Sequence, residues 1–109
     1  MKSFKEGMEP RIMREIIDGV RYDTEKAQMI AKGFYLEDYI WEYCARKIYL
    51  YKTPNGRYFA MYLTQRPGEI DHLTPLPLDV AMSCYEWLPE HVIPFKEAFP
   101  TIGIKIEEA

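Results

Sequence analysis

The pattern of apolar and polar residues is most regular between residues 47 and 64. Two runs rich in Tyr, Ile, Leu and Phe are joined there by Thr-Pro-Asn-Gly, in the sequence KIYLYKTPNGRYFAMYLT. Aromatic and β-branched residues are typical of strands, and Asn-Gly between two such runs indicates a tight turn. The pattern therefore predicts a β-hairpin over residues 47–64.

The proline in the turn decides the predicted register of this hairpin. A two-residue type I′ turn on Asn55-Gly56 needs a backbone N–H at residue 54, which Pro54 lacks. We therefore predict a three-residue loop, with Pro54 and Asn55 in a type I turn and Gly56 as a left-handed G1 bulge. This register places Thr53 opposite Arg57. One face of the hairpin then carries Tyr49, Tyr51, Phe59, Met61 and Leu63, and the other carries Ile48, Leu50, Tyr58, Ala60 and Tyr62.

Neither predicted face of the hairpin is polar. An antiparallel sheet with one face in water shows polar residues at alternate positions. The rejected register would leave an all-tyrosine face, which is not polar either. We therefore expect both faces to be covered, by helices, by another segment of the chain or by a partner.

Residues 11–18 leave two interpretations open. Ile12, Met13, Ile16 and Ile17 fall at helical spacing, between a proline at position 10 and a glycine at position 19, which favours a short helix or irregular structure. The alternative is a strand that turns back through Asp-Gly at positions 18 and 19. Residues 1–10 are expected to form a loose start.

Residues 24–32 are predicted to form a helix. Asp23 is a suitable N-cap, Glu25 in the first turn suits the positive end of the helix dipole, and Gly33 would end the helix. Residues 34–40 would then cross to the hairpin.

The chain after the hairpin predicts one strand, one helix and two short elements. Residues 69–73 read as a third strand that Thr74-Pro75-Leu76-Pro77 ends. The helical spacing of Leu78, Met82, Tyr85 and Leu88 predicts a helix over residues 78–88, which Pro89 ends. A short helical turn is expected between Pro94 and Pro100, and alternating isoleucines predict a last strand over residues 101–107.

These elements predict a single domain over residues 1–109. Its 109 residues suit one small domain, and 48% hydrophobic and 28% charged residues are an ordinary globular composition. The predicted class is α+β: a small antiparallel sheet centred on one long β-hairpin and packed by two or three helices.

The hairpin region is basic, whereas the rest of the chain is acidic. Residues 43–68 hold five basic residues and no acid, in a chain of net charge −3. The remaining residues hold nine basic and seventeen acidic side chains, a charge of −8. The basic residues of this region are Arg46, Lys47, Lys52, Arg57 and Arg66.

The cysteines and histidines do not form a recognisable metal or nucleophile motif. Cys44, His72, Cys84 and His91 lack the short paired spacing of structural zinc sites, and nothing marks an activated thiol. We expect no metal, no cofactor and no enzymatic activity; a small hydrolase or transferase is the less favoured alternative. Distant cysteines, no signal peptide and no apolar run of about 20 residues predict a cytoplasmic protein with no membrane contact.

Three short motifs resemble a family of small uncharacterised bacterial proteins, often encoded beside mobile or phage elements. They are Arg21-Tyr22-Asp23-Thr24 with Ala27, Leu50-Tyr51-Lys52-Thr53 followed by Gly56, Tyr58 and Phe59, and the segment 77–87, which resembles the closing helix of the family. The family helix usually opens with Ser or Thr, where this chain has Pro77. The resemblance implies an α+β fold and no established activity, and it supplies no functional residues.

The basic, tyrosine-rich hairpin is the candidate functional surface. Tyr and Arg are enriched at protein interfaces and often dominate their binding energy. We therefore predict an interaction, accessory or inhibitor protein, of a mobile element, with Lys52, Arg57, Tyr58 and Tyr62 as contact residues. The partner would be another protein or a second copy, which includes pairing with the outer strand if that strand is a sheet edge. The alternative is single-stranded nucleic acid, with phosphates on the cations and bases stacked on the tyrosines. The acidic remainder of the chain argues against it.

Overall fold

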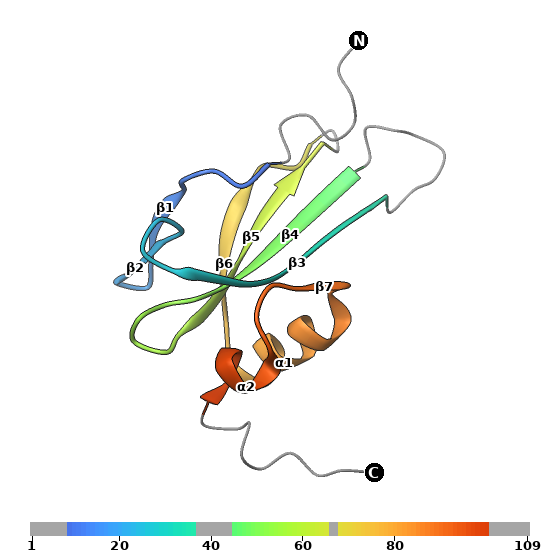
Figure 1. Ribbon diagram of the computed structural model, residues 1–109. Helices are drawn as coiled ribbons and strands as arrows, with labels where there is room; N and C mark the ends of the chain where they lie inside the picture. The colour runs from blue at the N-terminus through green and yellow to red at the C-terminus, as the bar shows by residue number, and fades with distance from the viewer. Residues whose placement is uncertain (1–8, 37–44, 66–67, 101–109) are drawn as a thin grey trace.

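The computed structural model describes residues 9–36, 45–65 and 68–100, which form one five-stranded antiparallel sheet, a separate two-stranded hairpin and two short helices (Figure 1). The predicted α+β class is confirmed. In the larger sheet the strand order is β6-β5-β4-β3-β7. Its strands are β3 (Gln28–Leu36), β4 (Ala45–Lys52), β5 (Tyr58–Thr64), β6 (His72–Leu76) and β7 (Glu90–His91).

Strands β4 and β5 form the predicted hairpin, with the predicted register. Thr53 N donates to Arg57 O at 2.8 Å, and Gly56 N donates to Thr53 O at 2.9 Å. Gly56 has a φ of 81°, in the left-handed region where glycine has no steric cost. Lys52 pairs with Tyr58 and the register continues to Arg46 opposite Thr64. The local chemistry of Pro54 and Gly56 therefore determined which side chains share a face.

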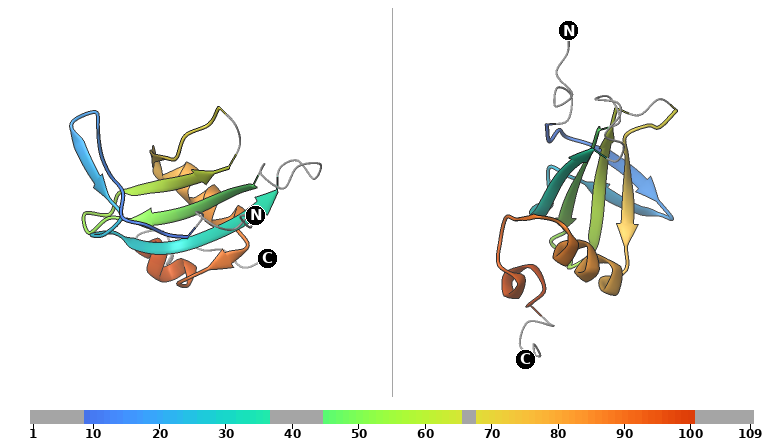
Figure 2. Two further views of the ribbon diagram at one scale, coloured as in Figure 1. Left: turned by 90° about the horizontal axis from the view of Figure 1, so that it is seen from above. Right: turned by 90° about the vertical axis from the view of Figure 1, so that its right-hand side faces the viewer.

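Both faces of the hairpin are covered by other elements of the same chain. Helices α1 (Leu78–Trp87) and α2 (Phe95–Ala98) pack on the face that carries Ile48 and Leu50. The small hairpin of β1 (Arg14–Ile17) and β2 (Val20–Asp23) lies on the opposite face (Figure 2), where it contributes Tyr22 to the cluster around Phe59. Tyr22 and Phe59 meet edge to face, with ring centroids 5.4 Å apart.

The preference for a helix in residues 11–18 was wrong, and the strand alternative is what the structure shows. Asp18 and Gly19 have φ values of 51° and 78°, as a two-residue type I′ turn requires. Ile17 is half-buried against the sheet, whereas Ile16 is 65% exposed. The apolar residues therefore alternate between core and solvent, as in a strand, although their spacing also matched a helix.

The helix predicted over residues 24–32 is wrong as well. Residues 24–27 form a turn, and β3 then pairs with β4 along its length, with Ile30 and Ala31 fully buried. Asp23 does bind a backbone N–H, that of Glu25 at 2.9 Å, but in a turn rather than at a helix start. Residues 28–36 form a strand despite their local helix pattern, because pairing with β4 satisfies the backbone N–H and C=O groups of both strands.

Gly33 lies inside β3 and does not end a helix. A Cβ atom built on Gly33 would lie 2.7 Å from Cδ of Pro89 and 2.8 Å from Cδ2 of Leu88. The glycine therefore permits close approach of the chain that leaves α1.

After the hairpin, the third strand is displaced and the helices are as predicted. Strand β6 runs over His72–Leu76 instead of 69–73, so residues 74–77 do not end it. Pro75 is tolerated because β6 lies at the edge of the sheet, where a missing N–H costs no ladder bond. Helix α1 matches the prediction for residues 78–88, α2 matches the predicted turn between Pro94 and Pro100, and β7 was not predicted. Residues 34–36, the start of the segment predicted to cross to the hairpin, belong to β3 instead. The rest of that segment (37–40), residues 1–8 and the predicted strand 101–107 lie outside the described residues.

Candidate functional site

Two pockets lie at opposite ends of the β4–β5 hairpin. The tip pocket, beside the turn, has a volume of about 310 Å³, and the base pocket, at the other end, about 380 Å³. The tip pocket is lined by Tyr22, Lys52, Gly56, Arg57, Tyr58, Leu76, Leu78 and Pro100. The base pocket is lined by Arg46, Tyr62, Thr64, Glu69, Ile70 and His72.

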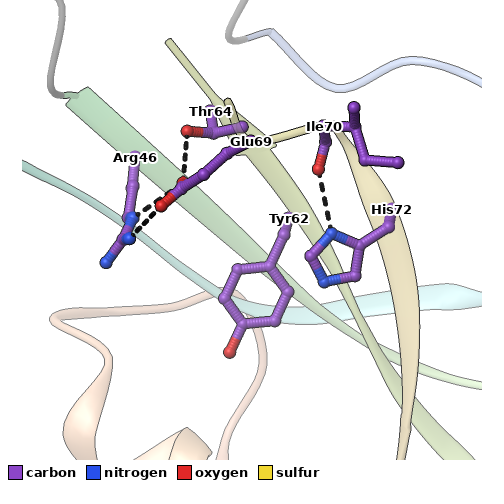
Figure 3. Close-up of a pocket in the computed structure, with 6 residues that line it drawn as sticks. All are labelled: Arg46, Tyr62, Thr64, Glu69, Ile70 and His72. Carbon is purple, nitrogen blue, oxygen red and sulfur yellow. Dashed lines mark hydrogen bonds and ion pairs between the residues drawn. The ribbon is translucent and has the colours of Figure 1, made fainter. Parts of the chain in front are cut away.

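The cation of the base pocket is neutralised within the chain (Figure 3). Glu69 accepts hydrogen bonds from both Nε and Nη2 of Arg46, the first at 3.2 Å, and a third from Thr64 Oγ1 at 2.8 Å. A bidentate guanidinium–carboxylate pair is directional and strong for an ion pair. Arg46 therefore serves to hold the segment that leads into β6 against the start of β4.

The aromatic groups of the base pocket are stacked on each other. The rings of Tyr62 and His72 lie 5.1 Å apart at an angle of 10°. Nδ1 of His72 lies 3.0 Å from Ile70 O, so this nitrogen carries the proton, since a carbonyl can only accept. Burial raises the pKa of the Tyr62 hydroxyl above its ordinary value.

The two cations of the tip pocket have no acidic partner among the described residues. Lys52 Nζ donates to the backbone carbonyl of Glu97 at 3.2 Å and forms no ion pair there. The side chain of Arg57 is exposed and makes no hydrogen bond or ion pair with any described residue. No Asp or Glu is among the described residues that line this pocket. The tip pocket is therefore a positively charged hollow whose charge is not cancelled by its own lining.

Tyr58 is part of the core rather than of the surface. Its residue exposure is 7%, its ring stacks on Phe99 with centroids 4.8 Å apart, and its hydroxyl donates to Ala98 O at 2.6 Å. Burial raises the pKa of this hydroxyl. Tyr58 therefore holds α2 against the hairpin. Only a small part of this residue is exposed to a partner in the tip pocket.

The structure brings three of the four predicted contact residues together. Lys52, Arg57 and Tyr58 line the tip pocket, whereas Tyr62 belongs to the base pocket. The apolar part of the tip pocket, from Leu76, Leu78, Pro100 and Tyr22, was not predicted. These residues come from segments far apart in the sequence, so no local pattern identifies them.

The hairpin cannot pair with another chain as an edge strand, because β4 and β5 are both internal strands. At the β6 edge of the sheet, the outward N–H of Leu73 donates to Glu15 Oε2 at 3.0 Å, and Pro75 has no N–H. An edge without open donors is a poor template for another strand. The possibility of a partner strand added to the hairpin is thus removed.

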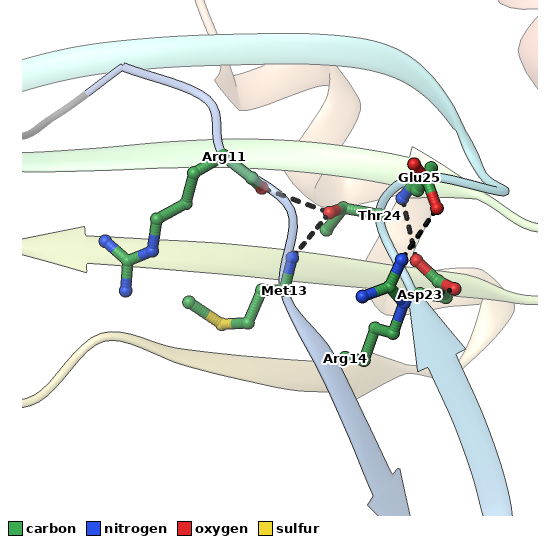
Figure 4. Close-up of polar contacts among 6 residues, drawn as sticks. All are labelled: Arg11, Met13, Arg14, Asp23, Thr24 and Glu25. Carbon is green, nitrogen blue, oxygen red and sulfur yellow. Dashed lines mark hydrogen bonds and ion pairs between the residues drawn. The ribbon is translucent and has the colours of Figure 1, made fainter.

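A cluster of polar residues links the start of β1 to the end of β2 (Figure 4). Thr24 Oγ1 accepts from Met13 N at 2.9 Å and donates to Arg11 O at 3.1 Å. Arg14 binds the carboxylate of Asp23 at 3.0 Å. Burial by itself would raise the pKa of Asp23, but the bonds from Glu25 N and Arg14 outweigh it and lower the pKa. These groups satisfy one another, which gives Asp23 and Thr24 of the Arg-Tyr-Asp-Thr motif a structural role.

No protein-family model, curated protein or solved structure matches this chain. The family resemblance noted in the sequence therefore stays a prediction, and no relative assigns a role to any residue. Within the described ranges, no three His, Cys, Asp or Glu side chains are placed to hold a metal ion. His72 and His91 lie in the two edge strands of the sheet. None of the described helices has the length and apolar character that crossing a membrane requires.

Proposed function

We propose that this protein is a non-enzymatic interaction protein, of the accessory or inhibitor type, that binds a protein partner through the tip pocket. Lys52 and Arg57 are its proposed contacts. The observation that carries the proposal is that both cations line one pocket, and none of the described residues in its lining is acidic. Charge that is not cancelled locally attracts and orients a partner of opposite charge.

A contrast with the basic residues that already form ion pairs supports this choice. An interface cation that is already paired must lose its partner before it binds another group, whereas Arg57 loses none. Arginine is also among the residues that most often dominate interface energies. Elsewhere on the chain Arg11 pairs with Asp71, Arg14 with Asp23 and Glu25, Lys32 with Glu90, and Arg46 with Glu69.

A protein partner is favoured over single-stranded nucleic acid. Binding of unpaired bases needs exposed aromatic faces in addition to cations. Tyr58 is buried against Phe99, and Tyr62 is stacked on His72 at the other end of the hairpin. The two tyrosines on which base stacking depended therefore already have stacking partners.

The proposal is tested by capture from a lysate of the organism that encodes the chain. Wild type is compared with the double variant Lys52→Glu plus Arg57→Glu. The expected result is a partner that wild type retains at low salt and the double variant does not, because the reversed charges repel it. The matched control is Arg21→Glu, an exposed arginine of β2 that lines neither pocket and makes no ion pair with a described residue.

Two outcomes contradict the proposal. The first is a partner that wild type and the double variant capture equally. The second is tight binding of labelled oligonucleotides at low salt that the double variant loses, measured by fluorescence anisotropy. The second result would assign the same cations to phosphate groups, with the strong salt dependence that such binding shows.

A further inference from the structure

We infer that the tip pocket takes the carboxylate of a single Asp or Glu side chain whose neighbours in the partner's sequence are apolar. This inference rests on the proposed function and names the chemistry of the segment that would bind. It follows from three features: a guanidinium without a partner among the described residues, apolar residues in the same lining, and two acidic residues next to the lining residues Leu78 and Lys52.

Arg57 supplies the group that selects a carboxylate. Its backbone is held on both sides, because its N–H donates to Thr53 Oγ1 at 3.0 Å and its carbonyl accepts from Thr53 N at 2.8 Å. Its guanidinium, in contrast, has no partner among the described residues. A guanidinium binds a carboxylate through two parallel hydrogen bonds, so Arg57 offers a directional contact although only its backbone is fixed. The Lys52 ammonium adds a second positive charge without a fixed plane.

Most of the other lining residues are apolar. Leu76 and Leu78 border the start of α1, and Leu78 is 43% exposed, although a leucine gains free energy on burial. Pro100, Tyr22 and Tyr58 are also among the lining residues. A volume of about 310 Å³ is at the lower end of the range for ligand pockets. A side-chain carboxylate with an adjacent apolar side chain satisfies both the cations and these apolar residues.

Acidic residues beside the pocket limit the ligand to one negative charge. Asp79 follows Leu78 in the first turn of α1, and Glu97 provides the carbonyl that Lys52 binds. Both side chains are exposed. Like charges placed close together repel, so an acidic run or a chain of phosphates that extends past Leu78 or Lys52 would be repelled by Asp79 or Glu97. A lone carboxylate between apolar residues avoids this repulsion.

The test is a titration of the ¹⁵N-labelled full chain, followed by NMR, with the probe acetyl-Leu-Glu-Leu-amide. We expect shifts of the backbone amides at positions 56–58, 76 and 78–79. The matched probe acetyl-Leu-Gln-Leu-amide removes only the charge and should bind about tenfold more weakly, as expected for loss of a charge-assisted hydrogen bond. Arg57→Gln should weaken binding of the Glu peptide by a similar factor, whereas Arg21→Gln should not.

Equal binding of the Glu and Gln peptides, or full binding by Arg57→Gln, would overturn the inference. Tighter binding of acetyl-Glu-Glu-Glu-amide or of inorganic phosphate would overturn it as well, since both carry more than one charge. The two proposals fail separately. If lysate capture depends on Lys52 and Arg57 but the Glu peptide does not bind, the ligand class is wrong and the proposed function stands. If capture does not depend on these cations, both are wrong.

Discussion

The two ends of the β4–β5 hairpin carry the same pair of residue types and use them in opposite ways. At the base, Arg46 is bound by Glu69, and Tyr62 remains half-exposed. At the tip, Tyr58 is buried under α2, and Arg57 has no partner among the described residues. The arginine therefore has a structural role at the base of the hairpin, and the tyrosine has one at the tip. A cation is available for a partner only where the rest of the chain has not already bound it.

The largest expected effect separates the two tyrosines. Tyr58→Ala should lower the free energy of unfolding by about 3–5 kcal/mol, because it removes a buried ring and leaves a cavity beside Phe99. Tyr62→Ala should cost roughly 1–2 kcal/mol, because this ring is only half-buried. Urea denaturation of both variants measures the difference.

Tyr58→Phe is the matched control. It keeps the ring and removes only the hydrogen bond to Ala98, so a loss of about 1 kcal/mol is expected. Equal losses for Tyr58→Ala and Tyr62→Ala would break the comparison between the two ends.

The next effect concerns the two arginines. Glu69→Gln should destabilise the protein by roughly 1 kcal/mol, since it weakens a bidentate pair whose groups are partly exposed and therefore screened by solvent. Arg57→Gln should change the stability by less than about 0.5 kcal/mol, as is usual for an exposed side chain without partners. Urea midpoints at low and high salt measure both. A larger loss for Arg57→Gln than for Glu69→Gln would show that Arg57 has a structural role.

The smallest difference is expected in the alkaline range, where the two ends should behave alike. Burial raises the pKa of both Tyr58 and Tyr62, so the folded protein keeps protons that the unfolded chain releases above its own pKa of about 10. Stability should therefore be unaffected by these groups below pH 10 and fall as the pH rises above it.

Tyr49 and Tyr51, whose pKa values burial raises to about 12, should add to this slope. Each single Tyr→Phe variant should reduce the slope by at most about 1.4 kcal/mol per pH unit. Urea denaturation between pH 9 and 11.5 gives the slope, and tyrosinate absorbance gives the titration. A variant at one end that removes the whole slope would contradict the expected equality.

The sequence by itself determined the features that depend on neighbouring residues. Pro54 and Gly56 decide the loop of the hairpin through one missing N–H and one left-handed residue, so its register and both faces follow locally. The apolar residues at helical spacing and the proline that follows them, Pro89, define helix α1 in the same way. Three residues of the tip pocket were found because they belong to this hairpin.

Where a local sequence pattern fits two structures, only the tertiary structure decided which of them forms. Asp23 can bind a following N–H in a turn or at a helix start, and pairing of β3 with β4 selected the turn. The availability of each cation was decided in the same manner. The charge of Arg46 is neutralised by an ion pair with Glu69, 23 positions away. Folding brings no acidic side chain among the described residues to Arg57. Charge counted along a chain is local, but neutralisation depends on which distant groups the packing of the sheet brings within hydrogen-bonding distance.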